Sequence, residues 1–150
     1  MKTYLLAIAV VLFAVSCNTT TKNKVEGTDA QSAATGTGEQ LVVDTTASTI
    51  KWKGSKVGGD HVGTIALKSG QLAVNGEEVA SGSFVIDMNN IVDEDLPTQI
   101  LKDKLTDHLK SGDFFDVAAY PESTFTITKI AKAAHPTDSV NYEVSGNLKL

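Results

Sequence analysis

The sequence predicts an all-β domain, an antiparallel meander of strands that carries one short helix. Three observations support this fold class. Apolar residues recur at every second position through most of the chain after residue 40, which is the spacing of one face of a strand. Short turn signals separate these runs, and Asn75-Gly76 is the strongest of them. The chain has a single cysteine, so no disulfide framework is available and the core has to rest on apolar burial.

The predicted strands follow one another with short connections. We expect them at 41–44, 48–53, 62–68, 71–75, 79–88, 123–130 and 140–150. Ser69-Gly70 is expected to form a turn that reverses the chain, and Asn75-Gly76 is expected to form the next hairpin. Sequential strands with short turns and one apolar face are typical of an antiparallel meander.

The alternation assigns a set of large side chains to one common face, which we expect to point inward. Val85 and Ile130 fall on the opposite face, so part of the outer surface is also expected to pack. The inward set consists of Ile50, Trp52, Ile65, Leu67, Phe84, Ile86, Met88, Phe125, Ile127, Tyr142 and Val144.

One helix is predicted between the strands that end near residue 88 and begin near residue 123. Asp95 is a candidate N-cap, Pro97 suits the first turn, and Gly112 is a candidate C′ residue. A single short helix at this place suits a lid across one end of a barrel. Its apolar stripe is expected to contain Leu101, Leu105, His108 and Leu109.

The first 16 residues predict an exported protein. Lys2 precedes an unbroken apolar run over 5–15, which is too short to span a bilayer comfortably and matches a secretory signal peptide. The run leads into Ser16-Cys17 and resembles a bacterial lipobox. That resemblance implies cleavage before Cys17 and a diacylglycerol on its thiol, which would anchor the protein on a membrane, facing the periplasm or the cell exterior.

Residues 17–40 are predicted to be a flexible linker behind the lipidated cysteine. Thr, Ser, Ala, Gly and Lys dominate this segment, so it buries too little apolar surface to offset the entropy of ordering. Its root-mean-square reach is about 25 to 30 Å. The remaining residues, 41–150, are one domain's worth of chain.

The charge pattern excludes nucleic acid as an expected partner. The formal net charge is −5, and all 13 basic residues are lysine. Arginine, which makes bidentate contacts to phosphate and guanine, is absent. No basic stripe replaces it, so we expect a lipid or another amphiphilic small molecule as the partner, and the membrane through the anchor.

Several motifs after residue 47 are similar to those of the YceI-like family of periplasmic and secreted proteins. The matching stretches are 48–52, 56–63 (Lys-Val-Gly-Gly-Asp-His-Val-Gly), 81–88 and 108–116, followed by Tyr120-Pro121 and Thr124-Phe125. The resemblance implies a lipocalin-like antiparallel barrel that holds a polyisoprenoid or similar lipid, without enzyme activity. About eight strands leave room for one small ligand.

The sequence departs from the family pattern at its C-terminal end, because family members usually continue with further strands. The strands predicted here are too few to close a barrel. We therefore expect domain 41–150 to lack its last strands and to leave a long edge unpaired. Such an edge would favour a homodimer.

The three histidines do not predict a metal site. His61, His108 and His135 have no i, i+4 spacing, and no further cysteine is available. His61 lies in a Gly-rich turn, where it either orients a polar ligand head at the barrel mouth or hydrogen-bonds the turn. His108 is interpreted as a structural histidine of the helix stripe, and His135 is expected to be exposed.

The acidic residues are interpreted as structural. Asp87-x-Asn89 fits the start of a calcium loop, but Ile91 and Val92 occupy positions that need a ligand and a glycine. Asp113 and Asp116 flank the pair Phe114-Phe115, which we expect to pin a turn to the core. Neither a catalytic triad order nor a phosphate loop nor a nucleophile elbow is found, so no enzyme and no cofactor other than a bound isoprenoid or quinone-like lipid are predicted.

The sequence therefore predicts a membrane-tethered carrier for a long-chain isoprenoid, a quinone-like molecule or a comparable amphiphile. The alternative is a structural or interaction lipoprotein whose barrel is filled by its own side chains.

Overall fold

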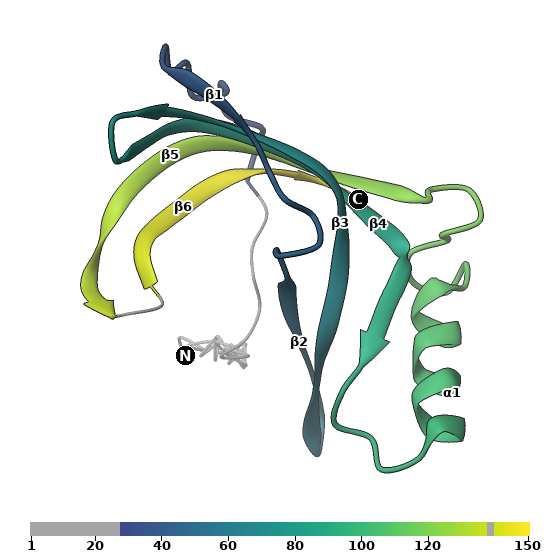
Figure 1. The fold of residues 1–150 in the computed structure, drawn as a ribbon. Coiled ribbons are helices and arrows are strands. Elements are labelled where there is room, and N and C mark those ends of the chain that lie inside the picture. Colours follow the sequence, from purple (N-terminus) through teal and green to yellow (C-terminus); the bar gives the residue numbers. More distant parts are fainter. Residues whose placement is uncertain (1–27, 138–139) are drawn as a thin grey trace, which may run out of the picture.

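The computed structural model describes residues 28–137 and 140–150. The predicted signal peptide and Cys17 lie outside these residues and stay predictions. The described residues form one antiparallel sheet and one helix (Figure 1). The elements are β1 (Glu39–Val42), β2 (Ile50–Lys56), β3 (Gly59–Asn75), β4 (Glu78–Asp93), α1 (Gln99–Lys110), β5 (Glu122–Thr137) and β6 (Val140–Lys149).

The sheet is six-stranded and has the order β1-β3-β4-β5-β6, and β2 also pairs with β3. β1 pairs with residues 71–74 of β3, and β2 pairs with residues 59–65 of the same strand. The sheet bends strongly, and β5 and β6 curl round on one side (Figure 1). It does not close within the described residues, so the predicted all-β fold with an incomplete barrel is confirmed.

The prediction of a turn at Ser69-Gly70 is wrong, because both residues lie within β3, which continues without reversing direction. A register shift between Leu67 and Ser69 marks a bulge instead, and bulges bend a strand. Gly70 is needed for a close approach. A Cβ at this position would lie 2.9 Å from the ring of Phe84 and from Val43. Two predicted strands are therefore one long, bent strand.

The hairpin at Asn75-Gly76 is confirmed. Asn75 pairs with Glu78 across a two-residue connection, and Gly76 has a φ of 63°. Glycine adopts this left-handed conformation without the steric cost that a Cβ atom adds in other residues. Gly58 has a φ of 93° and serves the same purpose between β2 and β3.

A bulge in β4 brings two apolar residues that are three positions apart into the core. Ala66 pairs with Asp87, whereas Ile65 pairs with Ile91, so Met88, Asn89 and Asn90 are extra residues. Ile91 shares the face of its partner Ile65, and Met88, two residues after Ile86, packs with Ile91 and Val117 in one buried cluster. A second bulge, between Ile127 and Lys129, pairs Ile130 with Val144. Ile130 therefore shares the face of Ile127, which corrects the prediction that it lies on the opposite face.

Helix α1 begins later than predicted. Thr98 is its N-cap and accepts a hydrogen bond from the Leu101 amide, and Ser111 is its C-cap. Asp95 is therefore not the cap, because its carboxylate is engaged with His61 and Val62. The helix packs against β4. It lies at the edge of the bent sheet (Figure 1).

Residues 28–38 have no regular secondary structure, but they contact the sheet. Gln31 bonds the side chain of Asn147 in β6, and the Ala34 amide donates to the Ile127 carbonyl of β5 at 2.8 Å. Gly36 lies against Ala80, and Gly38 lies against Val74. The segment thus crosses β6, β5, β4 and β3 in turn. The described part of the predicted linker is docked, and its last two residues belong to β1.

Candidate functional site

An apolar cavity of about 330 Å³ lies between the inner face of the sheet and the helix. Almost all of the protein surface that lines the cavity belongs to apolar atoms. The lining residues are Trp52, Lys53, Gly54, Ile65, Ile86, Met88, Ile91, Leu109, Phe115, Ser123, Leu148 and Leu150.

Strand register explains why these side chains meet. Leu67 pairs with Ile86, and Ile86 pairs with Ser123, so Ile65 and its strand neighbours share the inner face. The β4 bulge adds Met88 and Ile91 to that face. Leu109 from α1 and Phe115 from the following turn pack against this cluster from the side. The helix thus contributes to one wall of the cavity.

The predicted inward residues divide into two groups. Trp52, Ile65, Ile86 and Met88 line the cavity. The other predicted residues lie elsewhere on the sheet. Ile50 and Leu67 are half-buried, Ile127 is buried and Val144 is exposed. The rings of Phe84 and Phe125 form a tilted pair with centroids 6.4 Å apart, and the Tyr142 hydroxyl donates to the Glu77 carbonyl at 3.1 Å.

The pattern missed several lining residues. Ile91 was missed because the predicted strand ends at residue 88, whereas β4 continues to Asp93, and because the bulge that turns Ile91 inward has no signal in the alternation. Phe115 and Leu109 were expected in the core but not at a cavity. Leu148 pairs with Phe125, so the alternation in 140–150 could have placed it there.

The motif after the helix is only partly buried. Phe115 reaches the core, whereas Phe114 is 57% exposed and Asp113 is exposed. The His108 ring packs edge-on against Phe114 at 4.9 Å, and its Nε2 lies 3.5 Å from Asp113. The interpretation of His108 as a residue of the buried stripe is therefore wrong, and Phe114 does not pin the turn to the core.

The rest of this motif shapes the chain. Asp116 has a φ of 43°, which is tolerated best by Gly, Asn and Asp. Its amide donates to the Ser111 carbonyl, and its carbonyl accepts from the Tyr120 amide. Tyr120 is exposed, and the Pro121 carbonyl accepts from the Met88 amide at 3.0 Å. The structural interpretation of Asp116 agrees with these backbone contacts.

Ser123 places one polar group in the apolar cavity. The residue is 2% exposed. Within the residues that the structure describes, its Oγ is a buried side-chain atom without a hydrogen-bond partner. A buried hydroxyl without a partner is costly, so this atom is suited to a ligand that carries a polar group.

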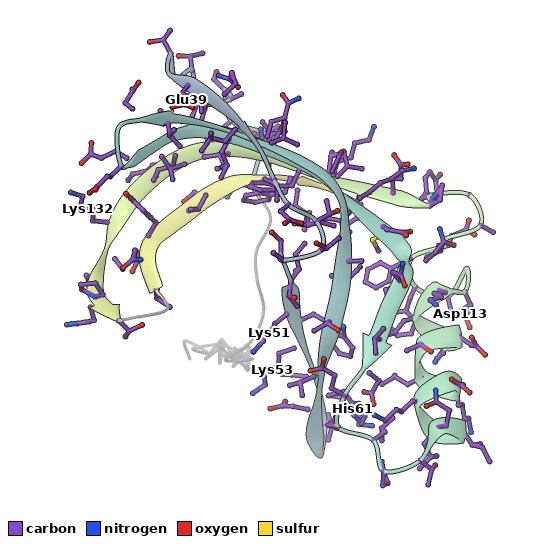
Figure 2. All side chains as sticks on the ribbon, in the orientation of Figure 1. Glu39, Lys51, Lys53, His61, Asp113 and Lys132 are labelled. Atoms are coloured by element: carbon purple, nitrogen blue, oxygen red, sulfur yellow. The ribbon has the colours of Figure 1, made fainter. Side chains whose placement is uncertain are left out.

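His61 does not line the cavity. It lies near the tip of the β2–β3 hairpin, whereas Asp113 lies at the other end of α1 (Figure 2). Its Nδ1 is 3.0 Å from Oδ2 of Asp95, and its Nε2 is 2.9 Å from Nζ of Lys56. Asp95 also accepts the Val62 amide through Oδ1 at 2.8 Å. The hydrogen bond from the Val62 amide, aided by the contact with His61 and opposed by desolvation, lowers the pKa of the Asp95 carboxyl. Two roles were predicted for His61, the orientation of a polar ligand head and hydrogen bonding within the turn. These contacts favour hydrogen bonding within the turn.

In the described parts of the chain, we find no helix with the length and apolar character needed to cross a membrane.

A bent antiparallel sheet that lines a partly open apolar cavity with one polar group is typical of a binding protein for a small hydrophobic molecule. The chain belongs to the YceI-like family, because the model of the YceI-like domain matches residues 41–150. Members of this family are known for binding isoprenoid lipids, and the family is generally non-catalytic. Among curated proteins, none matches the sequence.

Proposed function

We propose that this protein is a membrane-tethered carrier that binds a long-chain isoprenoid, a quinone-like molecule or a comparable amphiphile. The observation that carries the proposal is the apolar cavity of about 330 Å³. It supports a carrier over the alternative of a self-filled lipoprotein, because the side chains of the described residues leave this partly open space unfilled.

The size of the cavity suggests how the ligand binds. It is at the lower end of the range for small-molecule sites, so it accommodates one part of a long chain. Half-buried side chains of the same face, among them Leu67, Phe84 and Phe125, offer apolar surface for the rest. Burying one isoprene unit from water contributes about 4 kcal/mol. Transfer from a membrane is nearly neutral, because the membrane is equally dry, and this favours reversible loading.

Ser123 supports an amphiphile over a pure hydrocarbon. Its Oγ, which has no hydrogen-bond partner among residues 28–137 and 140–150, can donate a hydrogen bond to a carbonyl or accept one from a hydroxyl of the ligand. An isoprenoid alcohol or a quinone carries such a group at one end, and a hydrocarbon does not. We infer that the polar end of the ligand lies near Ser123.

The tether is part of the proposal and rests on the sequence of residues 1–17 alone. Cys17 would carry the lipid, and the domain would face the periplasm or the cell exterior. Mass spectrometry of the full chain purified from a bacterial host should show the mass of a diacylated Cys17 after cleavage. The variant Cys17→Ser should be released from the membrane fraction, and retention of this variant would contradict the tether.

Organic extraction of the purified full chain tests the carrier. We expect mass spectrometry to find a stoichiometric amphiphile with a polyisoprenoid-like tail. Ile86→Phe, which adds volume at the cavity wall, should lower the amount of bound lipid several-fold. Val92→Phe is the matched control, because Val92 is on the same strand and 48% exposed, and it should retain the lipid. An empty wild-type protein that stays empty after incubation with isoprenoid vesicles would contradict the proposal.

A further inference from the structure

A cluster of side chains that can act as metal ligands lies away from the cavity walls. His61 of β3, Asp93 at the end of β4 and Asp95 of the following loop each place one donor atom within 4.8 Å of the other two. The histidine is more than thirty residues from both aspartates in the sequence. The antiparallel pairing of β3 with β4 brings them together, because Gly63 pairs with Asp93.

Asp93 is the informative member of this cluster. It is 1% exposed. Its Oδ1 accepts a hydrogen bond from the Leu96 amide at 2.9 Å. Among the residues that the structure describes, its Oδ2 is a buried atom without a hydrogen-bond partner. An ionised carboxylate in this position is costly unless a positive charge lies beside it.

The nearby lysines do not supply that charge. Lys53 pairs with Asp60 at 2.6 Å, and Lys56 contacts the Nε2 of His61. The ion pairs found in ranges 28–137 and 140–150 include Asp95 with His61 but not Asp93. Two carboxylates and one imidazole therefore form a donor set, whose formal charge is about −2 when both carboxylates are ionised and the imidazole is unprotonated.

We propose that His61, Asp93 and Asp95 bind a divalent cation of the Zn²⁺ type, with water completing the coordination. One imidazole nitrogen and two carboxylate oxygens form a three-ligand set that Zn²⁺ accepts with an open fourth position. Imidazole favours first-row transition metals over Ca²⁺ and Mg²⁺, which prefer oxygen ligands alone.

The geometry requires one side chain, that of Lys56, to move. Tetrahedral Zn²⁺ with bonds of about 2.1 Å separates its donors by roughly 3.4 Å, and Nδ1 of His61 is 3.0 Å from Oδ2 of Asp95. A metal between these atoms replaces their hydrogen bond and leaves the imidazole proton on Nε2, so the Lys56 ammonium, 2.9 Å from Nε2, has to turn away. The Val62 amide holds Oδ1 of Asp95 and so orients the carboxylate, as supporting hydrogen bonds do in metal sites. Asp95 is exposed, which allows the ion to enter.

Trp52 offers an independent optical readout. It pairs with Gly63, which in turn pairs with Asp93, so the indole and the cluster are on the same face of the sheet. Trp52 is the single tryptophan of the chain. Co²⁺, which competes for sites of this type, is expected to quench its emission when it occupies the cluster.

Titration of the metal-free full chain in detergent with Zn²⁺ tests the proposal by calorimetry. We expect saturable binding of one ion per chain. His61→Gln and Asp95→Asn should each weaken binding at least tenfold and abolish the Co²⁺ quenching of Trp52. His108→Gln is the matched control, because it removes another histidine that lies beside an aspartate, and it should bind as the wild type does.

The thermal midpoint is the second measurement, since a ligand of the folded state raises it by mass action. Zn²⁺ should raise the midpoint of the wild type and of His108→Gln, but not that of His61→Gln. The alternative to a bound metal ion is a proton shared between the carboxylates of Asp93 and Asp95, which would also relieve the repulsion between two negative charges. If the cluster holds a proton instead of a metal ion, the wild type shows no saturable Zn²⁺ binding, and the proposal is overturned. Equal Zn²⁺ affinity of His61→Gln and His108→Gln would also overturn it.

Discussion

The indole of Trp52 occupies the space into which a side chain at Gly63, its partner on the neighbouring strand, would project. A Cβ at position 63 would be 2.6 Å from the ring and would overlap the Val92 carbonyl oxygen. Trp52 also donates from Nε1 to the Thr64 carbonyl at 3.1 Å. The orientation of a cavity-lining tryptophan thus depends on a neighbour that has no side chain.

Gly63→Ala should therefore destabilise the protein. The added methyl group meets backbone and a ring held by a hydrogen bond, and overpacking of this kind costs about 1–3 kcal/mol. Urea unfolding measures the effect. Gly59→Ala on the same strand is the control, because nothing lies within 4 Å of a Cβ at that position. Equal stabilities of the two variants would show that the indole moves aside freely.

Met88→Ala should lower the free energy of unfolding by about 2–5 kcal/mol, since it removes a buried side chain from the core and leaves a cavity. Met88 is 4% exposed and packs with Ile91 and Val117. Val92→Ala, on the exposed side of the same strand, should change the free energy by less than about 0.5 kcal/mol. A small loss at Met88 would mean that this wall of the cavity collapses easily.

The Asp87 carboxylate should make the stability of the bulge depend on pH. Burial opposes its ionisation, but hydrogen bonds from the Asn89 amide and the Asn89 and Asn90 side chains outweigh burial and lower its pKa below 3.8. A lowered pKa stabilises the folded state above the unfolded value, and this stability is lost as the pH falls through the folded value.

We therefore expect Asp87→Ala to have a lower thermal midpoint than the wild type at pH 6. The difference should be constant down to about pH 4 and should shrink at lower pH. Thermal unfolding followed by circular dichroism from pH 2 to pH 7 measures it. A difference that grows on acidification would contradict the assigned role.

Ser123→Ala should separate ligand binding from stability. The hydroxyl has no partner in the described chain, so its removal should leave the stability of the empty protein unchanged or raise it. Binding of an isoprenoid alcohol should weaken about three- to tenfold, as expected for one lost hydrogen bond. Ser83→Ala, on the exposed side of β4, is the control. Unchanged affinity of Ser123→Ala would place the polar end of the ligand elsewhere.

The alternation of apolar residues was sufficient to predict the antiparallel sheet and the inward direction of Trp52, Ile65 and Ile86. It failed where a bulge changes the parity, as at Ile91 and Ile130. It also failed at Ser69-Gly70, where a glycine that permits close packing resembles a turn. A sequence period carries no signal for an extra residue in a strand, because only the partner strand reveals it.

The cluster of His61 with Asp93 and Asp95 was beyond prediction for another reason. Metal motifs are recognised by local spacing, and these residues come from two strands and a loop. Asp95 was expected to cap α1, and this expectation was reasonable at its position before Pro97. Thr98, one residue before the helix, is the cap instead, which leaves Asp95 to contact His61.

The docked residues 28–38 change where the folding unit should be considered to begin. The family match starts at residue 41, yet Gln31 and Ala34 hydrogen-bond β6 and β5, and Ala73 beneath this stretch is 2% exposed. A protein cut back to the family boundary would uncover a strip of the sheet surface and lose these bonds. Recombinant versions intended for crystallisation or binding assays should therefore keep at least residue 28 onward.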